Sequence, residues 1–504
     1  MKRILIIIIL FCAILPAGAQ KALIKSLVPD TPSAAPDYFC TWNLQGYVVD
    51  YQNTDLFRKA MTEENIFGKG KYQNWISFFP TIRQDLYFVL DDSWDIPANA
   101  NTKNNNPYLG TTELNTERFP SFTGSPAERL KKLSNRIKAE GWKGAGGWIC
   151  AQKAETHADM DEETYWTERI KASGNAGFDY WKVDWGKESR NEPWRRMLTE
   201  LGRRHAPHLI MEHAMKNEYI EFSDAFRTYD VENIIAQSLT IRRVCDLLPY
   251  KAKEGAAGII NCEDEPYIAA GLGCAIGIMR HPLVGNLPNG KPDHAFPAVG
   301  RNLKRRLDEV VRGIRWHRIA EPFAVDGDFT IDDVNLEDTW LLQADETWNK
   351  NRKVGDVLKE SAPARASRRM PLPEVSETDD NRPFVLASRY PNGAVAVAAI
   401  GRVLGCEYVS KEVSVSIEVD SWDAPIGVFG YYKDVTFVYP TKISDKVCIY
   451  AQDLAGDVPV DITKEVKIKG NKVTIPGKAI RRIGLMNASE GDCSDPGLVV
   501  KIIK

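Results

Sequence analysis

The sequence predicts an α/β fold in which a (β/α)8 TIM barrel is followed by a C-terminal antiparallel β-sandwich domain. From about residue 36 to 325, short apolar segments alternate with charged, helix-like segments. Several of the apolar segments end abruptly in carboxylates, amides or aromatic residues. A doubly wound sheet would show the same alternation. The polar strand ends favour a barrel, because the C-terminal ends of all its strands meet at one mouth.

Eight apolar segments are the candidate barrel strands. They cover residues 38–42, 87–90, 144–149, 179–183, 209–211, 225–227, 258–260 and 275–279. Helix-like stretches separate them, for example at 126–140, 162–175 and 192–204. Eight strand–helix units of this length are typical of a (β/α)8 barrel, so we assign residues 20–328 to this domain.

After about residue 330 the pattern changes to strands without intervening helices. The candidates are 340–343, 384–387, 395–400, 413–419, 426–431, 446–450 and 472–475. The sequence Pro391-Asn392-Gly393 lies between two of them and predicts a hairpin turn, since Asn-Gly tolerates positive φ. Residues 329–504 are therefore predicted to form the β-sandwich, with a polar insertion near 349–381 that we expect to be a surface loop.

The first nineteen residues predict a cleaved signal peptide. Lys2 and Arg3 precede an apolar run at 4–15, and Ala17-Gly18-Ala19 offers a small-residue cleavage site. The run is shorter than the roughly 20 apolar residues that a spanning helix needs. We therefore expect a protein that is secreted across the inner membrane, either periplasmic or extracellular, without a membrane span.

Composition limits the classes of ligand. The chain of 504 residues carries 65 basic and 68 acidic residues, a formal net charge of −3, with no long block of one sign. This balance argues against a nucleic-acid partner and favours a neutral polar ligand. The seven histidines show no metal-ligand spacing such as HExxH, so we predict no metal site. The eight cysteines outside the leader form no CxxC pair, which favours buried free thiols over disulfides.

The segment from Tyr180 to Gly186 carries the first candidate catalytic group. Side chains alternate along a strand, so Tyr180, Lys182 and Asp184 share one face. A lysine and an aspartate on an inward face are costly to bury unless they are paired or used. A structural ion pair is one interpretation. The other is that Asp184 is a carboxylate nucleophile, held ionised by the ammonium group of Lys182.

A second carboxylate, Asp230, follows Arg227 two strands later. Cleavage of a glycosidic bond needs two carboxyl groups, one to attack or activate water and one to protonate the leaving oxygen. Asp184 and Asp230 are the natural pair, and Arg227 is available to bind a hydroxyl group. Asp230 could instead cap the following helix, and Asp224 is a nearby rival.

Other strand ends offer groups that could bind a sugar. Asp91 and Asp92 are adjacent carboxylates, and a site that keeps both usually uses them on hydroxyl or metal ligands. Trp94 could stack on a sugar face, although capping and packing are the alternatives for these residues. Glu212 ends another strand and has the same two interpretations. The remaining aromatic candidates at strand ends are Trp42, Trp148 and Trp185.

In their order along the chain, these motifs resemble the melibiase-type α-galactosidases of glycoside hydrolase families 27 and 36. The matching residues are Asp91-Asp92-x-Trp94, Trp181-Lys182-x-Asp184, Glu212, Phe226-Arg227-x-x-Asp230, Glu263-Asp264-Glu265 and Met279-Arg280-His281-Pro282-Leu283. The resemblance covers residues 38–285, and the C-terminal sandwich is also a feature of that family. The first loop, at 41–46, lacks the usual family pattern, which indicates a divergent member.

The resemblance implies a secreted, retaining exo-α-glycosidase, in the first place an α-galactosidase, that removes terminal α-linked sugars from oligo- or polysaccharides without a cofactor. It implies Asp184 as the nucleophile and Asp230 as the acid/base. It implies hydroxyl binding by Lys182, Asp91 and Asp92, contacts near the 2-position by Glu212 and Arg227, and an aromatic contact by Trp42. The alternatives are an α-N-acetylgalactosaminidase, a β-L-arabinopyranosidase, or a catalytically silent carbohydrate-binding protein.

Overall fold

The structure is a computed structural model that describes residues 25–49, 54–100, 104–228, 236–253, 255–291, 303–342, 353–443 and 446–503. The predicted signal peptide, residues 1–19, lies outside the described residues. Within the described part of the chain, no helix has both the length and the apolar character that crossing a membrane requires.

Eight parallel strands close into a barrel in chain order, and the last strand pairs with the first. They are β1 (Tyr38–Cys40), β2 (Tyr87–Leu90), β3 (Gly144–Ile149), β4 (Tyr180–Val183), β5 (Ile210–His213), β6 (Ala225–Arg227), β7 (Ile259–Glu263) and β8 (Ala275–Ile278). This arrangement confirms the predicted barrel. Strands β5 and β7 extend past their predicted ends, because polar residues there continue the ladder inside the barrel.

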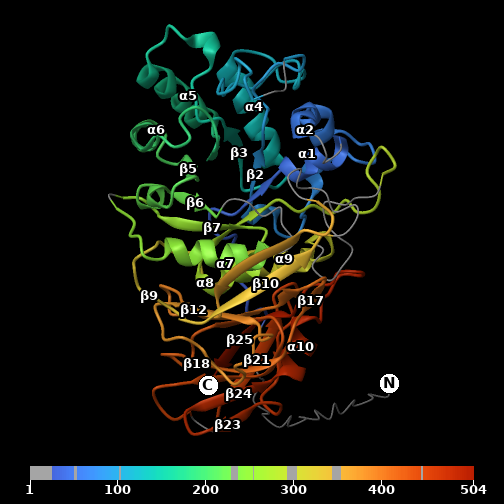
Figure 1. Ribbon diagram of the computed structural model, residues 1–504, viewed down its shortest axis with the longest axis vertical. Helices are drawn as coiled ribbons and strands as arrows, with labels where there is room; N and C mark the ends of the chain where they lie inside the picture. Colours follow the sequence, from blue (N-terminus) through green and yellow to red (C-terminus); the bar gives the residue numbers. More distant parts are fainter. Residues whose placement is uncertain are drawn as a thin grey trace, which may run out of the picture.

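Helices surround this barrel (Figure 1). They are α1 (Trp42–Val49), α2 (Thr54–Ala60), α3 (Glu63–Phe67), α4 (Pro126–Ala139), α5 (Glu162–Ala176), α6 (Glu192–His205), α7 (Ala236–Leu247), α8 (Pro266–Leu272) and α9 (Leu307–His317). Short 3₁₀ turns lie at Trp75–Ser77, Arg83–Asp85, Glu155–His157, Asn217–Glu221 and Leu303–Arg305. Local signals set the helix ends. Ser125 and Glu128 form a capping box at the start of α4, and Gly177 ends α5 in the left-handed conformation.

Two large sheets, together with two small two-stranded ones, form the C-terminal domain, which lies at one end of the molecule in Figure 1. The eight-stranded sheet has the order β22-β21-β25-β19-β15-β14-β12-β9, and the five-stranded sheet has the order β13-β18-β20-β24-β23. Their bounds are β9 Phe329–Ile331, β12 Arg365–Arg368, β13 Glu374–Val375, β14 Phe384–Arg389, β15 Val395–Ile400, β18 Val413–Glu418, β19 Ile426–Phe429, β20 Tyr432–Val438, β21 Cys448–Asp453, β22 Val460–Asp461, β23 Lys467–Lys469, β24 Lys472–Pro476 and β25 Gly497–Ile503. Most pairs are antiparallel, and β12–β14, β15–β19 and β18–β20 are parallel.

The eight-stranded sheet is the middle layer between the barrel and the five-stranded sheet. Alternate residues of β14 show this: Leu386 belongs to the core shared with the barrel, whereas Val385 and Ala387 belong to the core between the two sheets. Helix α8 packs against β14 and β15 on the barrel side. Helix α10 (Gly477–Gly484) packs against β20, β21 and β25. The period-2 pattern of these strands therefore supplies two hydrophobic cores at once.

The region at 349–381 differs from the predicted surface loop. Residues 349–352 lie outside the described residues, but β11 (Val357–Pro363) pairs with β10 (Asn335–Leu341), and β12 joins the eight-stranded sheet. A second small hairpin joins β16 (Arg402–Leu404) to β17 (Glu407–Val409). Arg368 lies in the segment that was expected to be a surface loop, but it is buried and donates to the carbonyl oxygens of Leu272 and Ala324. It therefore connects the sandwich to the barrel.

Candidate active site

The inward faces of four barrel strands bring Cys40, Asp91, Lys182 and Glu263 together. Lys182 Nζ lies 2.9 Å from Asp91 Oδ2 and 3.9 Å from Glu263 Oε1. The Cys40 thiol donates to Asp91 Oδ2 at 2.8 Å. Burial lowers the pKa of Lys182, but the charges of Asp91, Cys40 and Glu263 together raise it well above its usual value. Lys182 is therefore a fixed cation whose direct ion pairs are with Asp91 and Glu263 rather than with Asp184.

Asp184 follows β4 and is held by two donors. Arg227 Nη2 lies 3.0 Å from its Oδ1, and the indole Nε1 of Trp148 donates to its Oδ2 at 2.8 Å. Burial raises the pKa of Asp184, but Arg227, Lys182 and the Trp148 hydrogen bond together lower it below its usual value. Its side chain keeps 11% of its surface exposed. The carboxylate is thus ionised, oriented and still reachable.

Glu212 lies behind Arg227 and has no exposed side-chain surface. Arg227 Nε lies 3.2 Å from Glu212 Oε1, and the hydroxyl of Tyr180 donates to Oε2 at 2.6 Å. The amide of Asn261 donates to the same oxygen at 3.1 Å. Burial raises the pKa of Glu212 to about 7, against the opposing effect of Arg227. Glu212 therefore contacts a different nitrogen of Arg227 than Asp184 does, and so it can hold the guanidinium in place.

Arg195 of α6 fixes the chain at Asp184. Its Nη2 donates to the Asp184 carbonyl oxygen at 2.6 Å, and its Nε donates to the carbonyl of Ser189 at 2.8 Å. It also lies 2.9 Å from His213 Nδ1, and burial followed by the Arg195 charge lowers the pKa of that imidazole well below its usual value. Arg195 could not be predicted from the sequence, because an arginine on an amphipathic helix gives no signal that it will be buried.

The two adjacent carboxylates after β2 have different partners. Asp91 faces Lys182, as described above, whereas Asp92 pairs with Arg58 of α2 at 2.7 Å. Arg58 could not be predicted as a site residue either, because nothing in the sequence near it distinguishes it from a surface arginine. Burial raises the pKa of Asp92 to about 6.

The predicted aromatic residues have different surroundings. Trp42 begins α1, is half-buried, and its ring centroid lies 4.7 Å from that of Phe57. Trp148 and Trp185 lie next to each other beside Asp184, with ring centroids 5.5 Å apart. Trp94 has no exposed surface, and its Nε1 donates to the carbonyl of Trp148 at 2.9 Å. The expected stacking of a sugar on Trp94 is therefore corrected: its ring is part of the hydrophobic core.

The second predicted carboxylate, Asp230, falls in residues 229–235 and lies outside the described residues. Its rival Asp224 directly precedes β6, and its Oδ2 accepts a hydrogen bond from the Met211 amide at 2.9 Å. Asp224 is therefore at the N-terminal end of β6, whereas Arg227 is at the C-terminal end. Asp224 is not positioned to act together with Asp184.

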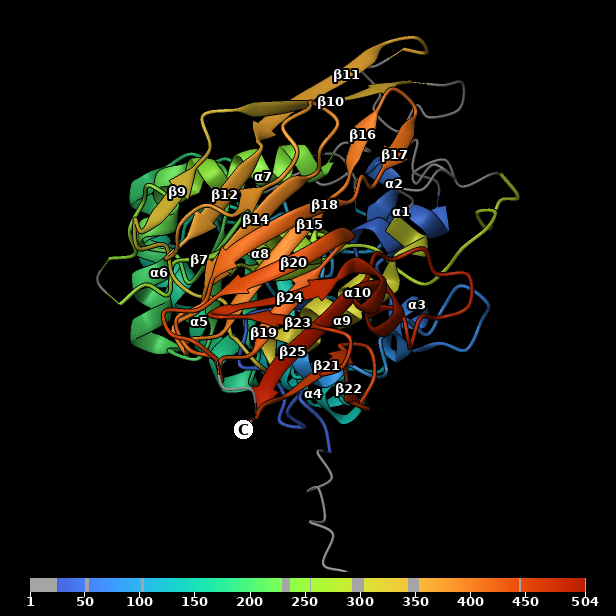
Figure 2. The same ribbon diagram turned by 90° about the horizontal axis from the view of Figure 1, so that it is seen from below.

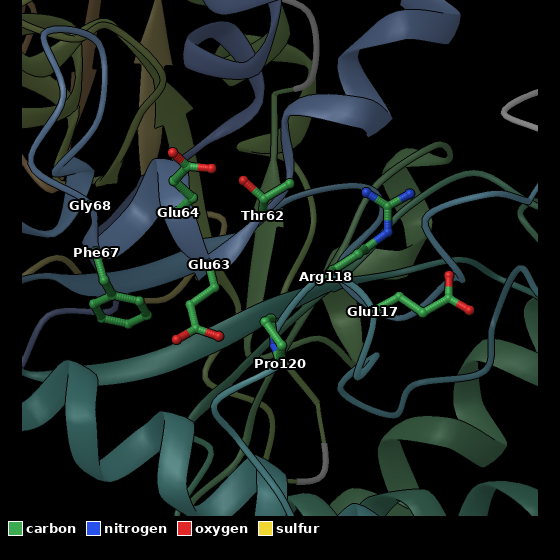
Figure 3. A pocket seen from close by; sticks show the side chains of 8 residues that line it. All are labelled: Thr62, Glu63, Glu64, Phe67, Gly68, Glu117, Arg118 and Pro120. Carbon is green, nitrogen blue, oxygen red and sulfur yellow. The ribbon is translucent and has the colours of Figure 1, made fainter.

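A surface groove of about 490 Å³ lies apart from this cluster. Its lining residues are Thr62, Glu63, Glu64, Phe67, Gly68, Glu117, Arg118 and Pro120 (Figure 3). None of them belongs to the carboxylate cluster. The Glu63 carboxylate contacts Ser121, and Arg118 donates to the carbonyl oxygens of Ile96 and Met61. The groove therefore does not replace the barrel interior as the candidate site.

The fold and the cluster together define a (β/α)8-barrel protein whose strand ends gather carboxylates around two buried cations, Lys182 and Arg227. No protein-family model matches the chain, and no curated protein matches it in sequence.

Solved structures to which the chain is similar include α-galactosidase I from Mortierella vinacea, with 11% identity, a TM-score of 0.42, and 93% of this chain and 96% of that chain covered. A family-27 β-L-arabinopyranosidase from Geobacillus stearothermophilus has 10% identity, a TM-score of 0.41 and coverages of 93% and 97%. A protein described as a putative α-N-acetylgalactosaminidase from Bacillus halodurans has 10% identity, a TM-score of 0.40 and coverages of 95% and 99%.

Proposed function

We propose that the chain is a glycoside hydrolase: a secreted, retaining exo-α-glycosidase, in the first place an α-galactosidase, of the melibiase type. The observation that carries this proposal is Asp184, an ionised and reachable carboxylate at a barrel mouth. Its two oxygens are oriented by Arg227 and Trp148, as a nucleophile requires. The resemblance of the ordered strand-end motifs to the melibiase family supports the choice of sugar.

In this mechanism Asp184 attacks the anomeric carbon while the carboxylic acid of Asp230 protonates the leaving oxygen. Asp230 then takes a proton from water, which attacks the covalent intermediate and releases the sugar. Asp184 loses its negative charge when it becomes an ester. Arg227 keeps Glu212 as a partner through that step, because it lies between the two carboxylates. The buried guanidinium therefore still has the carboxyl group of Glu212 beside it when Asp184 is an ester.

The charges at the site favour a neutral substrate. Among the described residues, Lys182 contacts Asp91 and Glu263, and Arg227 contacts Asp184 and Glu212. Lys182 and Arg227 are therefore each shared by two carboxyl groups, and Arg58 pairs with Asp92. A carboxylate or phosphate on the sugar would have to compete with these protein carboxyl groups for the cations, which disfavours uronides and sugar phosphates. A neutral hexoside or pentoside suits this balance.

Hydrolysis of a panel of aryl α- and β-glycosides by the wild type, Asp184→Asn and Asp224→Asn tests the proposal. The Asp224 variant is the matched control, because it changes a carboxylate at the opposite end of the barrel. We expect release from the α-galactoside by the wild type and the control, and loss in Asp184→Asn. NMR of the first-formed anomer should show retention of configuration.

Release from only an α-N-acetylgalactosaminide or a β-L-arabinopyranoside, also lost in Asp184→Asn, would keep the mechanism and change the sugar. Equal turnover by Asp184→Asn and the wild type would contradict the assignment of the nucleophile. Sugar binding without turnover, unchanged in Asp184→Asn, would favour a catalytically silent carbohydrate-binding protein.

A further inference from the structure

We propose that Arg58 is a positioning residue of the sugar site, which orients Asp92 so that one oxygen of this carboxylate accepts a hydroxyl group of the substrate. The inference rests on the proposed function and names a residue that the sequence motifs do not contain.

Asp91 and Asp92 differ in how far their oxygens are already satisfied. Asp91 Oδ1 accepts the Asp92 amide at 2.8 Å, and its Oδ2 accepts from Cys40 and Lys182. Asp92 Oδ2 accepts from Arg58, but its Oδ1 has no hydrogen-bond partner among the described residues although it is buried. A buried carboxylate oxygen without a donor is costly, and a sugar hydroxyl is a donor of the right kind. Of these two carboxylates, Asp92 is therefore the one with an oxygen, Oδ1, that can accept a hydrogen bond from the substrate.

Arg58 fixes Asp92 through two nitrogen atoms. Its Nε and Nη2 donate to the same oxygen, Asp92 Oδ2, at 2.9 and 2.7 Å. Nη2 also donates to Asn104 Oδ1 at 3.1 Å, and the guanidinium carbon lies 5.5 Å from the centre of the Trp185 ring. Two donors on one oxygen restrict rotation of the carboxylate and direct its other oxygen away from Arg58.

Arg58 also joins three segments at the mouth of the barrel. It belongs to α2, Asp92 follows β2, and Trp185 follows Asp184 after β4. The backbone carbonyl of Arg58 accepts a hydrogen bond from Arg118, which holds the end of α2 in place. A residue that connects these segments sets the distance between Asp92 and the nucleophile, and so it selects the sugar hydroxyl that Asp92 can reach.

The charge of Arg58 also affects when Asp92 is ionised. Burial raises the pKa of Asp92, Arg58 opposes this rise, and Asp91 and Asp184 add to it. Asp95, Cys150 and Arg118 are the other titratable or charged groups that interact with Asp92 from the neighbouring segments. Removing Arg58 therefore raises the pKa of Asp92 further. Near neutral pH the protonated carboxylic acid would then be a poorer acceptor for the hydroxyl group.

The test compares Arg58→Gln with Arg318→Gln in the full chain. Arg318 makes a similar two-nitrogen contact with buried Asp85, which precedes β2 at the other end of the barrel. We expect KM for the hydrolysed glycoside to rise about ten-fold or more in Arg58→Gln, with a smaller change in kcat, because one charge-assisted contact becomes misaligned. The acid limb of kcat/KM should also move to higher pH. Arg318→Gln should change neither.

A folded Arg58→Gln variant with unchanged KM and pH profile would overturn the proposal. If this variant does not fold, Arg58→Lys keeps the charge but cannot supply the two-nitrogen contact, so a raised KM supports the role and an unchanged KM overturns it. If the wild type hydrolyses no glycoside, the proposed function fails, and calorimetry with the free monosaccharides tests Arg58 alone. Weaker binding to Arg58→Gln then supports the inference, and equal binding refutes it.

Discussion

Replacing Glu212 by glutamine should change how the stability of the protein depends on pH. Glu212 is fully buried, and burial is the main reason that its pKa in the folded protein is raised to about 7. In the unfolded chain a glutamate titrates near its ordinary value of about 4.3. Between these two values the folded protein holds a proton that the unfolded chain releases. Stability contributed by this group is therefore fully present at low pH and is lost as the pH rises through this interval.

The difference between the two pKa values corresponds to about 4 kcal/mol at 1.36 kcal/mol per pH unit, of which about 3 kcal/mol falls between pH 4 and pH 8. Glutamine has nearly the same volume and does not titrate, and Arg227 retains Asp184 as its partner. The stability of Glu212→Gln relative to the wild type should therefore increase by about 3 kcal/mol from pH 4 to pH 8.

Calorimetric Tm values of the wild type and Glu212→Gln, measured from pH 4 to pH 8, test this expected change in stability. The Tm of the variant relative to the wild type should rise by about 3–5 °C, from the usual entropy of unfolding per residue. Asp92 and Asp95, whose pKa values are raised to about 6 and about 7 by burial, titrate in both proteins, so their contributions cancel in the comparison. Parallel Tm curves for the two proteins would refute the claim that Glu212 holds its proton near neutral pH.

Two further predictions concern the nucleophile and the sandwich. Trp148→Phe removes the N–H that donates to Asp184 Oδ2, so the pKa of Asp184 should rise. The acid limb of the kcat/KM profile should then move up by about one to two pH units. An acid limb that does not move would contradict this role of the indole. Arg402→Gln leaves buried Asp338 without its cation and should cost about 3–5 kcal/mol of unfolding free energy, measured by urea denaturation. Arg482→Gln, which breaks an exposed pair with Glu465, should cost at most about 1 kcal/mol, and equal losses in the two variants would show that burial of the pair does not decide its value.

The barrel could be predicted from the sequence because its strands are buried on both faces. A strand of this kind is a short apolar segment between two amphipathic helices, and β2, β3 and β6 have the predicted bounds. The extra length of β5 and β7 could not be predicted in the same way. Glu212 and Glu263 continue these strands because Arg227 and Lys182 pair with them from other strands, and such pairing is not visible in the local sequence.

For the site residues as well, the sequence predicts the direction of a side chain but not its partner on another strand. Period-2 alternation predicts that Lys182 and Asp184 point into the barrel, and the contacts of both side chains agree with it. The alternation does not say which cation meets which carboxylate, and Lys182 pairs directly with Asp91 while Arg227 pairs with Asp184. The burial of Trp94 could not be predicted, because this residue lies beyond the end of β2 at Leu90, where alternation no longer fixes the direction of a side chain.

This exchange of partners has a consequence for the chemistry. Had Lys182 been the main partner of Asp184, formation of a covalent intermediate would remove the charge that balances it. Lys182 instead keeps Asp91 and Glu263, and Arg227 keeps Glu212, whatever the charge state of Asp184. Asp184 can therefore change its charge in the proposed reaction without leaving Lys182 or Arg227 with no carboxyl group as a partner.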